Sequence, residues 1–109
     1  MTLKDIADKL NLKILSGENL PDKSPDSIYC CDLLSIVMGR APKNSAWVTV
    51  MANMNTVAVA VLADVACIVL SEGVDLSEDA LKKAKEEGVC VLATELPTFE
   101  VALKINELI

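Results

Sequence analysis

Residues 46–70, AWVTVMANMNTVAVAVLADVACIVL, decide the fold of this chain. Residues 47–51 and 66–70 are short apolar runs rich in β-branched side chains, which is typical of buried strands. The run TVAVAVL between them could be a strand by propensity alone. We favour a helix over residues 56–64, because a parallel crossover needs an element between its two strands and Asn55 can supply the N-cap. The stretch therefore predicts a strand–helix–strand unit.

The first half of the chain leads into this unit. Thr2 and Asp5 form a capping-box pattern at the start of an amphipathic helix. The elements expected after it are a strand over 12–15, a loop over 16–27, a strand over 27–31 and a helix that runs to about residue 40. Asp32 is expected to cap that helix, with Leu33, Leu34, Val37 and Met38 facing the core.

The second half repeats the alternation. Asp75 and Glu78 form an acidic capping pair for a charged helix, and Gly88 suits its C-terminal end. A strand over 89–93 follows, and Pro97 opens the last helix, since proline is favoured in the first turn. The residues of this helix expected to face the core are Phe99, Ala102, Leu103 and Ile105.

Strand–helix alternation with continuously apolar strands predicts an α/β fold. We expect a single domain over residues 1–109, with a mainly parallel sheet of about five strands and helices on both faces. The helix over 56–64 is apolar on all sides, whereas the helix over 76–87 is heavily charged. Because an all-apolar helix must be buried on every side, we predict a homodimer that uses this helix or its neighbours. The open alternative is that the chain's own termini cover it.

The expected ligand site lies beyond the carboxyl ends of the parallel strands, where ligands of such sheets bind. Three loops, over residues 51–56, 71–73 and 94–98 in chain order, meet this edge, and each precedes a helix N-terminus that favours an anion. The candidate ligand-binding residues are Asn53, Asn55, Thr56, Ser71, Glu72, Gly73, Thr94, Pro97 and Thr98. Glu72 and Glu95 oppose a phosphate electrostatically. In the alternative interpretation, Asn55 and Thr98 only cap helices and Gly73 only turns the chain.

Composition excludes several classes of function. The net charge of −6 arises in residues 55–109, which hold four Lys against ten Asp or Glu. No basic stripe or aromatic platform for nucleic acid appears. No apolar run reaches the roughly 20 residues of a membrane span. The cysteines have no zinc or CxxC spacing, and their use suits a reducing compartment. We therefore expect a cytoplasmic protein with no cofactor, no metal site, and no nucleic-acid or membrane partner.

Nothing in the sequence indicates an enzyme. The chain lacks histidine, which excludes a histidine-based triad, and it lacks glycine-rich phosphate-binding loops. The best nucleophile candidate is Cys31, because a following helix N-terminus would stabilise its thiolate. A thiol enzyme or redox sensor through Cys30 and Cys31 is therefore the third hypothesis, after a ligand-binding module and a protein-interaction module for a metabolic enzyme.

Three segments together resemble the DRTGG domain family, over nearly the whole chain and best from about residue 28 to 106. They are CDLLSIVMG (31–39), VTVMANMNTVAVAVLADVACIVLSEG (48–73) and GVCVLATELPTFEVALKI (88–105). Asn53, Met54 and Asn55 stand where the family usually has Gly-Asp-Arg. Ser71, Glu72 and Gly73 stand where it has Thr-Gly-Gly, so the chain looks like a divergent, stand-alone member.

The resemblance implies a regulatory module. Domains of this family are often appended to CBS-domain pyrophosphatases or phosphotransacetylases, and they resemble the N-terminal, non-kinase domain of HPr kinase. They tend to sit at dimer interfaces, and in some relatives a nucleotide binds nearby. The resemblance thus points to a dimeric, non-catalytic domain that binds a small anionic ligand, with an adenine nucleotide as the candidate.

Overall fold

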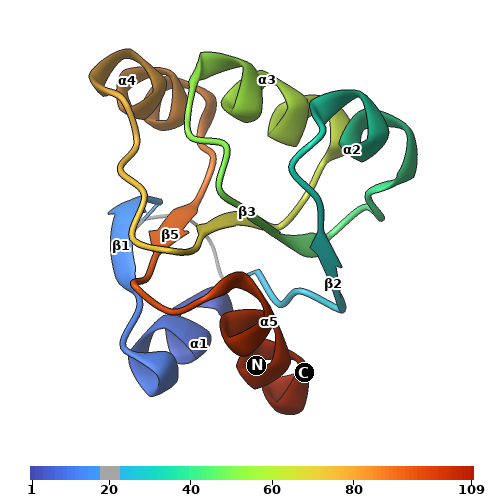
Figure 1. Ribbon diagram of the computed structural model, residues 1–109, viewed down its shortest axis with the longest axis vertical. Coiled ribbons are helices and arrows are strands. Elements are labelled where there is room, and N and C mark those ends of the chain that lie inside the picture. Colours follow the sequence, from blue (N-terminus) through green and yellow to red (C-terminus); the bar gives the residue numbers. More distant parts are fainter. Residues whose placement is uncertain (18–22) are drawn as a thin grey trace.

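A five-stranded sheet lies between two layers of helices in the computed structural model, which describes residues 1–17 and 23–109 (Figure 1). The helices are α1 (Leu3–Leu10), α2 (Leu34–Arg40), α3 (Met54–Ala63), α4 (Glu78–Glu87) and α5 (Thr98–Leu108). The strands are β1 (Lys13–Ser16), β2 (Ser27–Cys30), β3 (Ser45–Thr49), β4 (Cys67–Leu70) and β5 (Val91–Ala93). The loop expected over 16–27 lies partly outside the described residues.

The sheet has the strand order β1-β5-β4-β3-β2. Strands β2, β3, β4 and β5 pair in parallel, and β1 joins β5 antiparallel, with Lys13 opposite Ala93. The predicted α/β fold with a mainly parallel sheet and helices on both faces is therefore confirmed. The antiparallel edge strand places the end of α1 beside the carboxyl end of β5.

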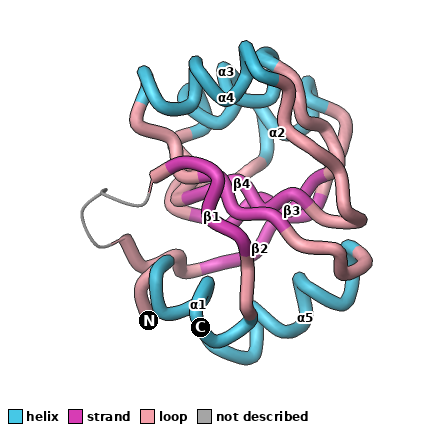
Figure 2. Tube along the Cα trace, turned by 90° about the vertical axis from the view of Figure 1, so that its left-hand side faces the viewer, coloured by secondary structure: helices cyan, strands magenta, loops and turns pink. Residues whose placement is uncertain are grey.

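Helices cover the two faces of the sheet unequally. α2, α3 and α4 lie side by side on one face, and α1 and α5 lie on the other (Figure 2). Strand side chains alternate between the faces, so Trp47 and Ile68 pack under the three-helix layer and Val48 and Val69 pack under the two-helix layer. Each face thus has its own core cluster.

The stretch that decides the fold forms the predicted strand–helix–strand unit, since α3 is a helix. Its N-cap, however, is Asn53 and not Asn55. Asn53 has extended backbone, its side-chain oxygen accepts from the Thr56 amide at 3.1 Å, and the Thr56 hydroxyl accepts from the Asn53 amide at 3.4 Å. The reason is local: only Asn53 has Thr56 three residues later, which closes a reciprocal capping box.

Two further cap predictions are wrong. α4 is capped by Ser77, whose hydroxyl accepts from the Ala80 amide, and not by Asp75. α2 has no side-chain cap, because the Asp32 carboxylate instead accepts from the Thr49 hydroxyl at 2.8 Å and from the Val50 amide at 2.9 Å. Asp32 therefore ties the end of β2 to the end of β3. The capping box of α1 and the Gly88 C-cap are confirmed.

Several side chains expected in the core are exposed. On α5, Ile105 is buried as predicted, but Phe99 is 76% exposed and Leu103 is 45% exposed, because Val101 faces the core beside Ile105. Beside and on α2, Leu33 and Met38 are also exposed, and Val37 is the buried residue of that helix. In the described part of the chain, no helix is long and apolar enough to cross a bilayer.

Candidate functional site

The carboxyl edge of the sheet contains a point where neighbouring strands lead to opposite faces. β4 continues to α4 on the three-helix face, and β5 continues to α5 on the other face (Figure 1). Connections that diverge in this way open a crevice outside the strand ends, which is where ligands bind in α/β sheets. The segments at this crevice are residues 71–75 and 94–98.

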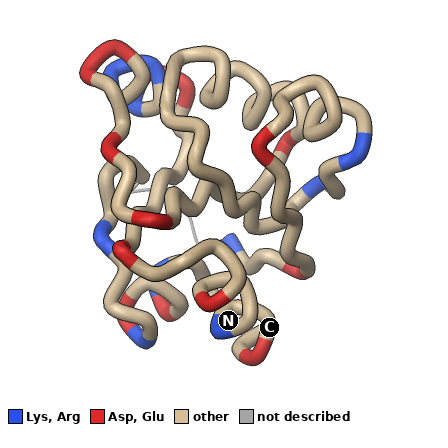
Figure 3. Tube along the Cα trace, viewed as in Figure 1, with Lys and Arg blue, Asp and Glu red and all other residues tan. Residues whose placement is uncertain are grey.

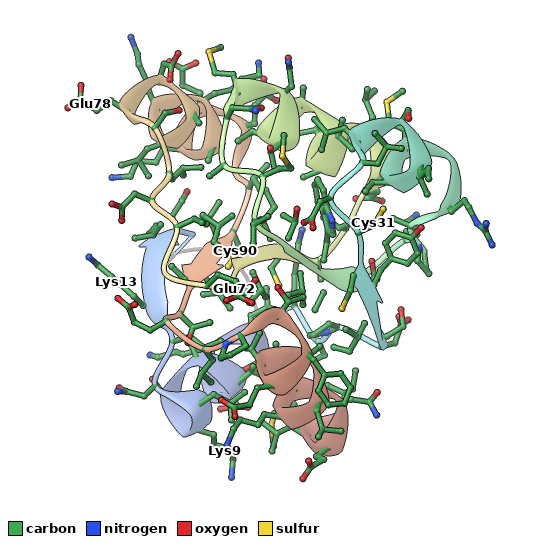
Figure 4. All side chains as sticks on the ribbon, in the orientation of Figure 1. Lys9, Lys13, Cys31, Glu72, Glu78 and Cys90 are labelled. Carbon is green, nitrogen blue, oxygen red and sulfur yellow. The ribbon has the colours of Figure 1, made fainter. Side chains whose placement is uncertain are left out.

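These two segments are bonded to each other. The Gly73 amide donates to the Thr94 carbonyl at 3.0 Å, and the Glu72 amide donates to the Leu96 carbonyl at 2.9 Å. Ser71 and Thr98 share a hydrogen bond of 2.6 Å between their hydroxyl oxygens. The Glu72 carboxylate also accepts from the Thr98 amide at 2.9 Å, at the start of α5 (Figure 4). The second and third predicted loops therefore form one unit.

Gly73 is required in this unit for two reasons. Glu72 and Gly73 both have positive φ, of 60° and 72°, and the Val74 amide donates back to the Ser71 carbonyl. A Cβ on Gly73 would stand 2.6 Å from Oε2 of Glu95. The Glu95 carboxylate thus lies beside the turn, where glycine leaves room for it.

A pocket of about 430 Å³ lies beside this turn. Its walls come from the end of α1, the start of β1 and the two bonded segments. The residues that line it are Leu10, Asn11, Lys13, Gly73, Val74, Asp75, Ala93, Thr94, Glu95 and Leu96. Of the sequence-predicted site residues, only Gly73 and Thr94 line it, while Ser71, Glu72 and Thr98 hold the adjoining loops together.

The first predicted loop does not join this unit. Asn53 and Thr56 satisfy each other in the α3 capping box, and Asn55 is exposed in the first turn of α3. The preceding residue, Ala52, accepts from the Ser77 amide and so connects this loop to the start of α4. Pro97 stands at the N-cap position of α5 without a side-chain cap bond. The structure therefore separates the predicted residues into two groups. Those of the first loop form the start of α3, and those of the second and third loops lie in the two bonded segments at the crevice.

Sequence reasoning missed Asn11, Lys13 and Asp75. Asn11 and Lys13 reach the pocket because β1 runs antiparallel to β5, so the start of β1 lies at the carboxyl edge of the other strands. No local pattern in residues 12–15 signals that pairing. Asp75 was interpreted as a helix cap, but α4 begins three residues later and leaves it in the pocket wall.

Charge in the pocket is mixed. Lys13 is its one basic residue, and Asp75 and Glu95 are its acids. Among the residues that the structure describes, none of these three side chains forms an ion pair or a side-chain hydrogen bond. Figure 3 shows acidic positions in both bonded segments, and Figure 4 shows Lys13 on β1 at the outer side of the same edge. The pocket therefore offers three charged groups to a ligand.

Two of the four cysteines, Cys30 and Cys67, are poorly placed for thiolate chemistry. Burial, together with the Asp32 carboxylate, raises the pKa of the Cys30 thiol. Cys31 donates its S–H to the Leu33 carbonyl at 3.7 Å. Burial raises the pKa of the Cys67 thiol well above its ordinary value. Within residues 1–17 and 23–109, no three side chains gather that could hold a metal ion.

A small α/β domain with one helix layer on each face and a polar pocket at a strand-end crevice is the class that the fold and the site define. The family model for the DRTGG domain matches residues 5–108, and the chain belongs to that family. No curated protein matches the sequence.

Nearly the whole chain is similar to a solved structure that contains a domain of this family. It is that of the CBS and DRTGG domains of the regulatory region of Clostridium perfringens pyrophosphatase, complexed with the activator diadenosine tetraphosphate. The TM-score is 0.78 at 14% identity, covering 95% of this chain and 45% of that chain. The chain thus spans less than half of that structure's length, and at this identity the likeness establishes the fold.

Proposed function

We propose that this chain is a non-catalytic regulatory module that pairs with a second copy and binds a small ligand, an adenine nucleotide, in the pocket beside Gly73. The observation that carries the proposal is the pocket itself, which lies at the strand-end crevice where β4 and β5 lead to opposite faces. A cytoplasmic location is part of the same proposal.

The pocket's chemistry supports a nucleotide. Its volume of about 430 Å³ falls within the range of small-molecule sites. Carboxylates accept hydrogen bonds from ribose hydroxyls, and a lysine ammonium attracts phosphate. Asp75, Glu95 and Lys13 supply both groups in the lining of the same pocket. The similar pyrophosphatase region was crystallised with a nucleotide activator, which makes adenine nucleotides the first ligands to try.

The dimer is supported by an apolar face on the three-helix layer. Six of the ten large hydrophobic side chains that are exposed in the described chain belong to α2, α3 and the residue before α2: Leu33, Ile36, Met38, Met54, Val61 and Leu62. We call these six residues the α2–α3 face. Exposed apolar surface of this kind marks an interface, and an isologous dimer covers the same face on both copies.

The proposal is tested by thermal unfolding in the presence of adenosine, AMP, ATP and diadenosine tetraphosphate. A ligand that binds only the folded state raises Tm in a saturable way, and 100-fold excess over Kd corresponds to about 2.7 kcal/mol. We expect at least one adenine compound to raise Tm. The matched variant Gly73→Val should lose the response, because a branched side chain there meets Glu95 and fills the pocket wall. A flat response to all four compounds would remove the nucleotide proposal.

A second candidate is a protein-interaction module for a metabolic enzyme, and the exposed α2–α3 face favours it. The two candidates differ in the oligomeric state of the purified chain. A dimer by light scattering assigns the face to a second copy. A monomer that recovers an enzyme from native lysate, and loses it in Leu62→Glu, assigns the face to a partner protein.

A further inference from the structure

The hydrogen bonds at the pocket rim are already used within the chain. The amides of Glu72, Gly73 and Val74 donate to the carbonyls of Leu96, Thr94 and Ser71. The Leu96 amide donates to the Thr94 hydroxyl at 3.1 Å. These four amides are therefore not open to an anion, whereas a row of open N–H groups is what strand-end loops usually offer to phosphate.

The N-terminus of α5, which lies at the rim, is also occupied by a side chain of this chain. The Glu72 carboxylate accepts from the Thr98 amide at 2.9 Å and so occupies the N-terminus of α5 with a negative charge. A phosphate at this point would meet a carboxylate where the helix dipole would otherwise attract it. One of the three helix starts to which the sequence analysis assigned an anion is therefore occupied by a carboxylate.

The pocket wall instead presents hydrogen-bond acceptors. The Glu95 carboxylate lies beside Gly73, since its Oε2 would stand 2.6 Å from a Cβ built at that position. Asp75 adds a second carboxylate, and Asn11 and Thr94 add neutral groups. Ionised carboxylates only accept hydrogen bonds, so the matching ligand surface carries O–H or N–H donors. Lys13 is the single group in the lining that attracts an anion.

We infer that the pocket receives the nucleoside end of its ligand, a neutral group rich in O–H and N–H donors, that Glu95 selects this group, and that the phosphate stays at the Lys13 side. The inference rests on the proposed function and reverses the polarity expected from the sequence. Glu95 acts as a specificity-determining residue because its carboxylate stands in the pocket lining beside Gly73 and can accept hydrogen bonds from the ligand. The ligand's charge is then recognised by Lys13 alone, which is a point charge on a flexible stem.

The test is isothermal titration of the wild-type chain, Glu95→Gln and Lys13→Gln with adenosine, AMP and inorganic phosphate. Glu95→Gln keeps the shape of the side chain over Gly73, and Glu78→Gln on α4 is the matched control outside the pocket lining. We expect adenosine to bind and phosphate alone not to bind. Glu95→Gln should weaken adenosine and AMP by about tenfold or more, as loss of a hydrogen bond to a charged group does. Lys13→Gln should weaken AMP only.

Two other outcomes separate the inference from the function on which it rests. Binding of phosphate alone, or tighter AMP binding in Glu95→Gln, would show that the pocket selects the anion; the inference would fall while the ligand-binding function stands. Absence of binding by wild-type protein to all three probes would remove the proposed function and the inference with it. Melting curves of each variant check that the fold is intact.

Discussion

α3 and α4 are neighbouring helices of ten residues each on the same face of the sheet, yet they present opposite surfaces to solvent. α3 has no charged residue, whereas α4 carries seven, and the contrast is visible along the chain in Figure 3. Both bury small residues against the sheet: Val57 and Ala60 from α3, and Ala80 and Ala84 from α4. α4 shows that this position in the fold does not require apolar residues on the outside.

Burial in the core of the single chain therefore does not explain why α3 carries apolar side chains on its exposed surface. Leu62 is 71% exposed and gains nothing from the monomer's core. Its position beside the exposed residues of α2 is explained if a second copy covers the α2–α3 face. Gly39 on α2 agrees with this, because a Cβ there would meet nothing within 4 Å in the single chain. The comparison thus separates what the fold needs from what an interface would need.

The largest expected effect is on assembly. Leu62→Glu should raise the dimer dissociation constant about thirtyfold or more, as loss of a central interface residue does. The matched change on α4, Lys82→Glu, places the same carboxylate on the neighbouring helix and should leave the dimer unchanged. Analytical ultracentrifugation of both variants measures the difference. Equal dissociation constants for wild type and Leu62→Glu would contradict the proposed interface, since the exposed surface of α3 would then not contribute to assembly.

The next effect concerns the two N-caps. Asn53→Ala should destabilise the protein by about 1–2 kcal/mol and Ser77→Ala by about 0.5–1 kcal/mol. The difference arises because α4 also has Glu78 and Asp79 in its first turn to interact with the helix dipole, whereas α3 has no acidic residue there. Urea unfolding of the two variants gives both values. A larger loss for Ser77→Ala would contradict this account of the caps.

A smaller effect concerns the C-caps. Both helices end on a left-handed residue, Asp64 with φ 54° after α3 and Gly88 with φ 69° after α4. Gly88→Ala should cost about 1 kcal/mol, because a Cβ is strained in this region. Asp64→Gly should stabilise by about 0.5 kcal/mol, since the strain is relieved and the Asp64–Lys43 ion pair is exposed and weak. Thermal melts resolve the opposite signs, and two changes of the same sign would refute the argument.

The smallest effect is local and depends on pH. α1 and α3 both have capping boxes, but only that of α1 contains an ionisable group. Hydrogen bonds from the Thr2 amide and then from its side chain hold the pKa of the Asp5 carboxyl below its ordinary value of 3.8. A lowered folded-state pKa stabilises the fold above the unfolded value, and this stabilisation is lost as pH falls through the folded value.

Amide exchange at the start of α1 should therefore rise below about pH 4, while the first turn of α3 stays protected in the same range. Asp5→Asn removes the titration and serves as the control. If the two helix starts lost protection together, the change would reflect global unfolding instead of the α1 box.

The sequence predicted the sheet and α3 because long-range pairing agrees with local pattern there: residues 46–70 hold two strand-length apolar runs, separated by a stretch long enough for a crossover helix. The N-cap of α3 was harder to predict, because Asn53 and Asn55 are the same residue type two positions apart. Only Asn53 has Thr56 three residues later to complete a capping box. Asp32 could not be placed, since its partner Thr49 is 17 residues away along the chain.

The candidate site could be predicted only in part. The crevice between β4 and β5 follows from parallel strands, so Gly73 and Thr94 were found. Its far wall depends on the antiparallel pairing of β1, which no sequence pattern in that strand predicts. Lys13 and Asn11 were therefore not predicted as site residues. The hydrogen bonds that occupy the rim amides join backbone groups of residues 71–74 and 94–96. Such backbone hydrogen bonds cannot be predicted from the types of the residues that make them.

One measurement tests the central claim most directly: an NMR titration of isotope-labelled protein with AMP, followed amide by amide. The account predicts saturable shifts confined to residues 10–13, 73–75 and 93–96, with the amides of Asn53, Asn55 and Thr56 unmoved. Shifts centred on the first turn of α3, with the pocket amides unmoved, would place the ligand at the α3 capping box and would contradict the account.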